Sequence, residues 1–384
     1  MADGHGEDGL DGLETPCLLL DADRVRANIG SMRAHLDRLQ VGLRPHLKTA
    51  KSRDVARLAM ADPAGPATVS TLREAEYFAE GGVRDMIYAV GIAPQKLDRV
   101  GAIRRRWGAD LAVILDSRAQ AEAVAAWSRR TCDKLPALIE VDADGHRSGV
   151  GPGDTDGLRA IGRALAEGAD LRGVLLHAGD SYGLSDPADL RAAAEAERVA
   201  AVSAALILRE AGLPCPIVSV GSTPTARYAA HLDGVTEMRA GVFMIGDLFQ
   251  AGVGSCAIDD IALTVLTTVI GHQRDKGWII TDAGWMALSR DRGTARQSVD
   301  QGYGVVCDRA GRPYRDLIVR DANQEHGIVA LRAGSAAALP ELPVGARLRI
   351  LPNHACATGA QHAGYNVVAD GRLTGAVWPR INGW

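Results

Sequence analysis

The chain has 384 residues, of which 47% are apolar and 23% are charged. This composition is typical of a globular protein, and the length suits one large domain or two moderate ones. The formal net charge of −4 argues against nucleic acid or a membrane surface as a partner. No apolar run reaches the length of a membrane-spanning helix.

The six cysteines do not form a disulfide framework in a chain of this length, and no pair has CxxC spacing. The first residues, "MADGHGEDGLDG", are acidic and rich in glycine, unlike a secretion signal. We therefore expect a cytoplasmic protein in a reducing compartment.

Between about residue 40 and residue 245, short β-branched runs alternate with longer segments of helical period. Strand–helix alternation predicts a parallel sheet, and this number of strands predicts a closed (β/α)8 TIM-like barrel. An open doubly wound sheet is the alternative. The predicted strands are "GLRPHLKT", "ATVSTL", "MIYAV", "LAVILD", "ALIEVD", "GVLLHA", "IVSVGS" and "GVTEMRAG".

After about residue 255, strand-like segments follow one another through Gly, Pro and Asp turns, without long helices between them. This pattern predicts a second, all-β domain, which the early strand "TPCLLLD" at 15–21 joins. We expect the barrel to span residues 22–255 and the β domain to comprise residues 1–21 and 256–384.

Polar residues gather where the predicted barrel strands end, which is where barrel enzymes carry their active groups. Strand ends are polar in most proteins, so no single polar residue at a strand end shows that the site is functional. Lys48 is the most informative, because burial at a barrel rim lowers the pKa of an amine and makes it a nucleophile toward a carbonyl. Lys51 is a rival, three residues further on. The polar strand-end residues are Lys48, Asp142, Arg147, His177, Ser222 and Arg239.

The segment "VGSTPT" at 220–225 places a glycine and hydroxyl groups after a strand. Backbone N–H groups at a following helix start, with Ser222 or Thr223, would suit a phosphate group. Such turns are common, so this indication is weak by itself.

The segment "PNHACATGAQH" at 352–362 contains His354 and Cys356, two residues apart on a segment that we expect to be extended. An imidazole and a thiolate suit Zn²⁺, and an incomplete protein shell is typical of a catalytic metal. The H-x-C pattern alone favours a plainer interpretation, in which His354 caps a turn and Cys356 is a buried apolar residue. In "NQEHG" at 323–327, Glu325 and His326 are acid–base candidates or simply a turn.

Other common catalytic patterns are absent from the sequence. It contains no GxxxxGK[ST] loop, no HExxH helix and no GxSxG elbow. "GVGPGD" at 149–154 does not follow the dinucleotide-binding pattern.

Taken together, several long motifs resemble the fold-type III pyridoxal-phosphate (PLP) enzymes, which are alanine racemase-like barrels. The resemblance is closest to the D-serine dehydratase and D-threonine aldolase family, and within it to the D-threo-3-hydroxyaspartate dehydratase type. It runs from about Leu13 to Trp384. The motifs are "TPCLLLDADRVRANI", "RPHLKTAKS", "DGHRSGVG", "SVGSTPT", "DAGWMALSRDRGTARQ", "NQEHGI" and "RILPNHACATGAQ".

This resemblance implies that Lys48 is the catalytic residue and forms a Schiff base with PLP. Arg239 would face the pyridine nitrogen and keep it unprotonated. The implied cofactor-binding residues are Lys48, Arg147, His177, Tyr182, Ser222, Thr223, Arg239, Gly241 and Val242.

The resemblance also implies a divalent metal at His354 and Cys356. A thiolate ligand favours Zn²⁺ over Mn²⁺ or Mg²⁺. Aldolase relatives tend to carry Asp at the position of Cys356, which favours a dehydratase, and "DAGWMAL" offers no tyrosine base for a racemase. The candidate substrate-binding residues are Arg290, Arg292, Gln324 and His326.

The implied activity is that of a lyase that eliminates water from a D-3-hydroxy amino acid. The expected substrate is D-threo-3-hydroxyaspartate, which would give oxaloacetate and ammonia, with D-serine as a second substrate. Aldol cleavage of D-3-hydroxy amino acids is the alternative, and a non-catalytic PLP-binding protein is a more remote one. The family resemblance further implies a homodimer.

Overall fold

The computed structural model describes residues 8–145 and 147–384. The chain divides into two compact units. One comprises residues 30–241 with 383–384, and the other comprises residues 1–29 with 242–382. In the described residues no helix has both the length and the apolar character that crossing a membrane requires.

The first unit is built on eight strands that pair in parallel throughout. They are β2 (Gly42–Pro45), β3 (Ala67–Val69), β4 (Asp85–Gly91), β5 (Asp110–Leu115), β6 (Pro136–Val141), β7 (Asp170–Leu176), β8 (Ile217–Val220) and β9 (Glu237–Ala240). Their order in the sheet is β2-β9-β8-β7-β6-β5-β4-β3, and a parallel bridge between His46 and Thr68 joins the two ends. The sheet is therefore a closed barrel, and the alternative of an open doubly wound sheet is wrong.

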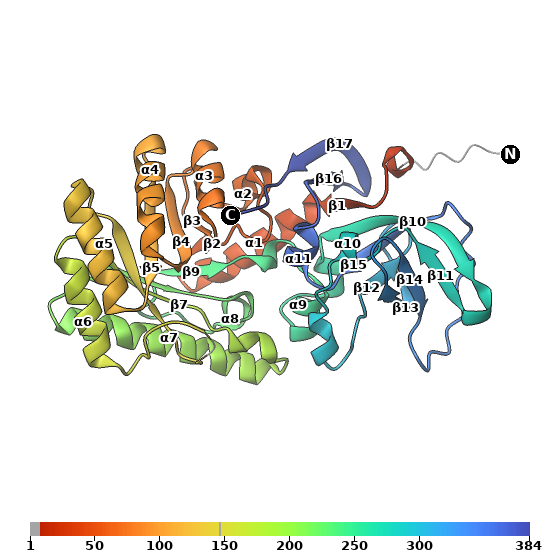
Figure 1. Cartoon of the computed structure of the whole chain (residues 1–384). Helices are drawn as coiled ribbons and strands as arrows, with labels where there is room; N and C mark the ends of the chain where they lie inside the picture. The colour runs from red at the N-terminus through yellow and green to blue at the C-terminus, as the bar shows by residue number, and fades with distance from the viewer. Residues whose placement is uncertain (1–7, 146) are drawn as a thin grey trace. The chain divides into compact units, whose positions relative to one another are not determined.

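A helix follows each strand before the next one begins, as the strand–helix alternation predicts, and helices α3 to α7 surround the strands (Figure 1). The strands are buried on both faces, and all six residues of β6 are buried. Aliphatic side chains such as Ile87, Ile114 and Leu138 fill the centre. The helices are α1 (Ala22–Arg38), which begins in the other unit, α2 (Arg53–Ala59), α3 (Leu72–Glu80), α4 (Leu97–Trp107), α5 (Arg118–Thr131), α6 (Thr155–Ala166), α7 (Pro187–Glu210) and α8 (Thr223–Tyr228).

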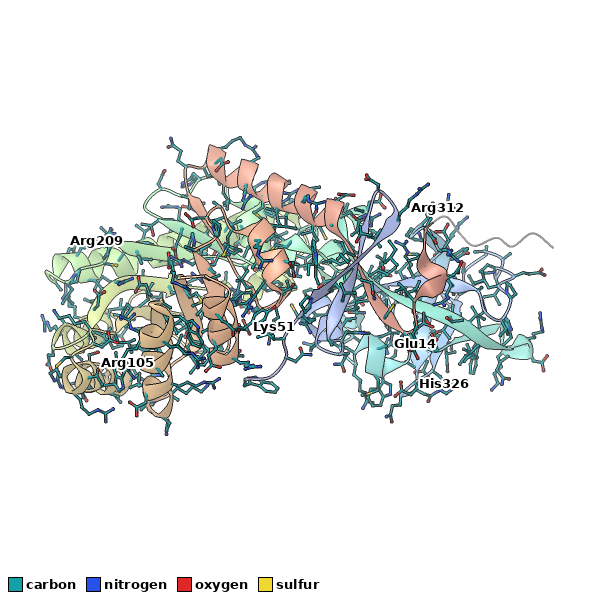
Figure 2. The ribbon with its side chains drawn as sticks, turned by 90° about the horizontal axis from the view of Figure 1, so that it is seen from above. Glu14, Lys51, Arg105, Arg209, Arg312 and His326 are labelled. Atoms are coloured by element: carbon teal, nitrogen blue, oxygen red, sulfur yellow. The ribbon has the colours of Figure 1, made fainter. Side chains whose placement is uncertain are left out.

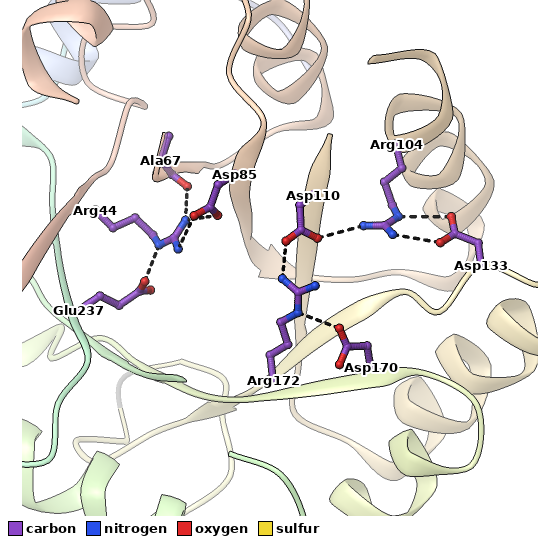
Figure 3. A network of polar contacts seen from close by, with 9 residues as sticks. All are labelled: Arg44, Ala67, Asp85, Arg104, Asp110, Asp133, Asp170, Arg172 and Glu237. Carbon is purple, nitrogen blue, oxygen red and sulfur yellow. Dashed lines mark hydrogen bonds and ion pairs between the residues drawn. The ribbon is translucent and has the colours of Figure 1, made fainter. Parts of the chain in front are cut away.

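Ion pairs connect the amino-terminal ends of the barrel strands (Figure 3). Arg44 binds Asp85 at the start of β4 and Glu237 at the start of β9, each at 2.7 Å. Arg172 likewise joins Asp110, at the start of β5, to Asp170, at the start of β7. This end of the barrel is a structural network, which leaves the carboxyl-terminal ends for chemistry.

The second unit contains a nine-stranded sheet in the order β11-β14-β13-β12-β15-β10-β1-β16-β17. Because β10 also pairs with β11, strands β10 to β15 form a closed ring. All pairs are antiparallel except β1 with β16, and β1 lies between β10 and β16. The strands are β1 (Cys17–Asp21), β10 (Leu263–Gln273), β11 (Trp278–Thr281), β12 (Gly304–Cys307), β13 (Pro313–Ala322), β14 (Gly327–Leu331), β15 (Arg347–Pro352), β16 (Gly364–Ala369) and β17 (Arg372–Pro379).

The segments predicted as strands after residue 255 form strands of this sheet, and β1 joins them as expected. The sequence did not indicate β12, which is only four residues long. The unit also contains the short helices α9 (Leu248–Val253), α10 (Trp285–Leu288) and α11 (Ala355–Gly359).

Candidate functional site

Lys48 follows β2 at the carboxyl-terminal end of the barrel. The strand ends at Pro45, His46 forms the closing bridge, and residues 47–50 form a turn. Lys48 is exposed. The expectation of a buried amine is therefore wrong for this chain, because the backbone leaves the barrel wall two residues before Lys48.

Lys51, the rival lysine, has a structural partner (labelled in Figure 2). Its Nζ lies 3.2 Å from Oε1 of Glu74, whose side chain is fully buried. A buried carboxylate requires a cation, so Lys51 balances the charge of Glu74.

His177 follows the end of β7 and is held as a neutral imidazole. Its Nδ1–H donates to the carbonyl oxygen of Gly221 at 2.8 Å, which leaves Nε2 unprotonated. Burial, together with the charges of Lys48, Arg147 and Arg239, lowers the pKa of His177 to about 3, although the bond to Gly221 opposes this shift. Cations from three segments of the barrel therefore act on this ring.

Arg239 lies within β9 and is 4% exposed. Its guanidinium donates to Oγ of Ser219 at 2.8 Å and to the carbonyl oxygen of Leu176 at 2.7 Å. Burial lowers the pKa of Arg239 to about 10, against the charges of Glu237 and Glu197. The group remains a fixed cation at neutral pH.

Arg147 lies in the loop after β6 and is exposed. Its Nη2 lies 3.9 Å from Oε1 of Glu140, which is 5% exposed. Burial raises the pKa of Glu140, while the charge of Arg147 opposes that shift. The neighbouring His146 of the "DGHRSG" motif lies outside the described residues.

The turn after β8 contains one buried hydroxyl group that could bind a ligand, that of Thr223. Ser222 caps α8, and its Oγ accepts a hydrogen bond from the N–H of Thr225 at 3.2 Å, so this side chain is already engaged. Thr223 Oγ1 is buried and has no hydrogen-bond partner within the described part of the chain. Tyr182, from the turn after β7, places its hydroxyl 3.5 Å from the N–H of Thr223.

Gly241, at the end of β9, lies against the backbone of the turn after β2. A Cβ atom there would come within 2.7 Å of the carbonyl oxygen of His46. Val242 follows and is 8% exposed. A side chain at Gly241 would clash, so only glycine allows β9 to end this close to the turn after β2.

His354 and Cys356 lie at the start of α11 in the second unit, and the expectation of an extended segment is wrong. β15 ends at Pro352, and His354 is the residue before the helix. Asp247 Oδ2 accepts the N–H of Ala355 at 2.8 Å, which favours the helical turn over a continued strand. The side chains of His354 and Cys356 are nevertheless in contact and form a hydrogen bond with each other.

Asp291 holds the imidazole of His354 from the other side. Its Oδ2 lies 2.6 Å from Nδ1 of His354. Burial alone would lower the pKa of His354, but Asp291, Cys356 and Asp247 together raise it to about 11. Across residues 8–145 and 147–384 no group of three or more His, Cys, Asp or Glu residues is arranged as a metal site.

Two known families match consecutive parts of this chain. Residues 20–248 match the alanine racemase N-terminal domain, and residues 262–368 match a putative serine dehydratase domain. The chain is also 54% identical to the D-threo-3-hydroxyaspartate dehydratase of Delftia sp. (strain HT23), over 98% of this chain and 100% of that one. The chain belongs to the D-serine dehydratase family of alanine racemase-like enzymes.

Other members of this D-serine dehydratase family are more distant. The chain is 27% identical to the D-serine dehydratase of Dictyostelium discoideum, over 95% of each chain. It is 30% identical to the D-threonine aldolase of an Arthrobacter species, over 95% of this chain and 91% of that one. These comparisons identify the chain as an enzyme, and specifically as a lyase.

A solved structure of the Delftia dehydratase has a TM-score of 0.94 with this structure, over 98% of this chain and 100% of that one. Variants of a D-threo-3-hydroxyaspartate dehydratase replace a histidine and, two positions later, a cysteine by alanine. The cysteine variant is described as the metal-free form.

The barrel residues fit PLP, the cofactor of this D-serine dehydratase family. The phosphate would meet the buried hydroxyl of Thr223, which has no hydrogen-bond partner within the described part of the chain. The cations that act on His177 suit an anionic cofactor. The His354–Cys356 pair fits a metal as well, because its donors are soft and a carboxylate already holds the second ring nitrogen of the histidine.

The four candidate substrate residues lie in the second unit. Arg290 is exposed and stacks on Trp285 with its Cζ 5.0 Å from the ring centroid. Arg292 pairs with Asp300 at 2.7 Å. Gln324 and His326 are exposed in the turn between β13 and β14, where His326 is labelled in Figure 2.

Several residues at these sites were not found from the sequence. Asp291 lies between the two arginines that drew attention in "SRDRG", and its contact with His354 is a tertiary feature. Glu197 lies in "AAAEAERV", a pattern typical of a solvated helix, yet it is 2% exposed. No local pattern in the sequence indicates that Asp291 contacts His354 or that Glu197 is buried.

Proposed function

We propose that this enzyme is a PLP- and divalent-metal-dependent dehydratase. It eliminates water from D-threo-3-hydroxyaspartate to give oxaloacetate and ammonia, with D-serine as a second substrate. The observation that carries the proposal is the 54% identity to an enzyme of that activity over 98% of the chain. Domain roles follow: residues 22–255 bind PLP, and residues 1–21 with 256–384 carry the metal pair.

PLP, when bound, supplies an electron sink that makes the Cα proton of an amino acid acidic. Lys48 would hold it through Nζ, and the amine of Lys48 is the group that would accept the Cα proton. A single lysine at one end of the barrel reaches only one face of the substrate, so only one enantiomer reacts. The exposed position of Lys48 supports this role, because its amine is accessible.

The other barrel residues bind and orient PLP. Thr223 and Ser222, with the backbone at Gly241 and Val242, would hold the phosphate. Arg239, fixed by two hydrogen bonds, faces the pyridine nitrogen and keeps it unprotonated, because a guanidinium has only donors. His177 and Tyr182 have ring centroids 6.1 Å apart and would lie against the PLP ring. Arg147 would bind near its phenolic oxygen.

A divalent ion at His354 and Cys356 supplies a Lewis acid for the β-hydroxyl, which is otherwise a poor leaving group. A thiolate ligand favours Zn²⁺ over Mn²⁺ or Mg²⁺. Asp291 binds Nδ1 of His354, so that Nε2 is the nitrogen left for the metal. Cys356, where aldolase relatives tend to carry Asp, supports dehydration over aldol cleavage.

The second carboxylate of hydroxyaspartate needs a cation, and we assign this role to Arg290. Arg292 is a weaker candidate, because Asp300 already pairs with it. Gln324 and His326 complete the set of substrate-binding residues. The spacing of the six cysteines in the sequence supports a reducing, cytoplasmic compartment, and the family resemblance supports a homodimer.

Product analysis tests the proposal. The purified protein is incubated with both D-3-hydroxyaspartate diastereomers, D-serine and D-threonine, with and without a chelator. We expect chelator-sensitive release of ammonia and a 2-oxo acid, fastest with the D-threo diastereomer. Glycine and an aldehyde would identify an aldolase instead, and a yellow protein inert with all four substrates would identify a PLP-binding protein without activity.

A further inference from the structure

Glu197 is a buried carboxylate that the proposed reaction does not use. It lies in the middle of α7 and is 2% exposed. One oxygen, Oε1, accepts hydrogen bonds from the backbone N–H of Ala178 at 3.0 Å and from that of Gly221 at 2.9 Å. These two N–H groups belong to the turns after β7 and after β8. Glu197 therefore ties together two strand ends that come from different parts of the barrel.

Hydroxyl groups close this connection into a ring. Thr225 hydrogen-bonds to the Glu197 carboxylate and lies 3.0 Å from Ser222 Oγ. Ser222 Oγ lies 2.9 Å from Ser181 Oγ, and Ser181 donates to the carbonyl oxygen of Ala178 at 2.7 Å. The ring thus returns to Ala178, where it began. We call it the Glu197 ring, and it consists of Glu197, Ala178, Ser181, Ser222, Thr225 and Gly221.

The Glu197 ring fixes the segments that carry the candidate cofactor residues. His177 directly precedes Ala178, and its Nδ1–H binds Gly221 of the same ring. Thr223 directly follows Ser222, and its buried Oγ1 has no hydrogen-bond partner in the described chain. The ring thus uses the hydroxyl groups of its own members and leaves that of Thr223 for a ligand.

We propose that Glu197 is a positioning residue for the phosphate group of PLP, acting through the Glu197 ring on the turn that carries Ser222 and Thr223. The inference rests on the proposed function, because it presumes that PLP is the ligand. In this role Glu197 does not contact the cofactor itself. It accepts hydrogen bonds from two backbone N–H groups and so fixes the conformation of the turn.

The role depends on acceptor geometry rather than on negative charge. Burial raises the pKa of Glu197, which favours the neutral form. Glutamine keeps an acceptor oxygen for both N–H groups and offers an N–H₂ group to Thr225. Alanine leaves both buried N–H groups without an acceptor, and a lost acceptor of this kind costs on the order of tenfold in an equilibrium constant.

The experiment compares Glu197→Ala, Glu197→Gln and a control, Glu195→Gln, which changes a half-exposed carboxylate on the same helix. The apo forms are titrated with PLP and with pyridoxal, which lacks the phosphate, and binding is followed by absorbance. We expect Glu197→Ala to raise the apparent Kd for PLP about tenfold and that for pyridoxal less than about twofold. Glu197→Gln and Glu195→Gln should stay within about threefold of the unchanged protein for both ligands.

Equal weakening for PLP and pyridoxal would show a general structural role and overturn the proposal, as would an unchanged Kd for PLP. If Glu197→Ala does not fold, Ser181→Ala breaks the same ring at its other side, and it should also weaken PLP selectively over pyridoxal; equal affinity would overturn the proposal. An unchanged protein that binds no PLP at all would instead refute the proposed function.

Discussion

Two lysines follow β2, and their surroundings give them different roles. Lys48 is exposed, whereas Lys51 pairs with the buried Glu74. Lys48→Ala should abolish turnover and the absorbance of the lysine–PLP linkage without loss of stability. Lys51→Met should keep that absorbance but lower the free energy of unfolding by about 3 kcal/mol, because it leaves a buried carboxylate unpaired. Spectra and urea denaturation of both variants check this, and the opposite pattern would make Lys51 the catalytic residue.

Asp291 should control the metal affinity of His354. A carboxylate that binds the second nitrogen of a ligand histidine fixes the orientation of its ring, and its loss usually weakens metal binding on the order of 10- to 100-fold. Asp291→Asn should therefore raise the Kd for Zn²⁺ by that factor in a titration of the metal-free protein. Asp300→Asn, on the same segment but paired with Arg292, is the control and should leave the Kd unchanged.

Stability should fall in acid partly because of His177. Its folded pKa is about 3 against a usual value of 6.5, so between these pH values the unfolded chain holds a proton that the folded chain does not. Stability is therefore lost as pH falls through this window, by about 1.4 kcal/mol per pH unit for one group. His177→Asn should therefore reduce the slope of the free energy of unfolding against pH, measured by urea denaturation, by about that amount.

At the scale of elements, the ends of the barrel strands separate stability from chemistry. Arg44 pairs with Asp85 and Glu237 at the amino-terminal ends, and its own side chain is buried. Arg44→Leu should lower the free energy of unfolding by about 3 kcal/mol while the Kd for PLP stays unchanged. Arg118→Ala, which breaks an exposed pair on α5, should cost less than about 0.5 kcal/mol. A lowered PLP affinity in Arg44→Leu would mean that the two ends are coupled.

The elements themselves were largely predictable, because strand–helix alternation is a local pattern of the sequence. The exceptions have physical causes. β12 is too short to show a period, and α11 forms because Asp247, far away in the sequence, accepts the N–H of Ala355. The exposure of Lys48 depends on where the closing bridge at His46 ends the barrel wall, which composition does not indicate.

At the scale of the whole molecule, the lysine assigned to PLP and the residues assigned to the metal belong to different compact units. Removal of the metal with a chelator should therefore suppress ammonia release while the PLP absorbance persists, because none of the PLP-binding side chains is a metal ligand. Absorbance and ammonia are measured on the same sample, and Zn²⁺ added back should restore the rate. Undiminished elimination in metal-free protein would make the His354–Cys356 pair structural.

The place of β1 between β10 and β16 has a consequence for synthesis. The ribosome makes β1 early, yet both of its neighbours in the sheet follow only after every strand of the barrel. All strands of the barrel are therefore synthesised before β10 and β16, the strands that pair with the backbone of β1. A nascent chain stalled before residue 364 would thus expose one edge of an apolar strand, and such chains would be the ones most in need of a chaperone.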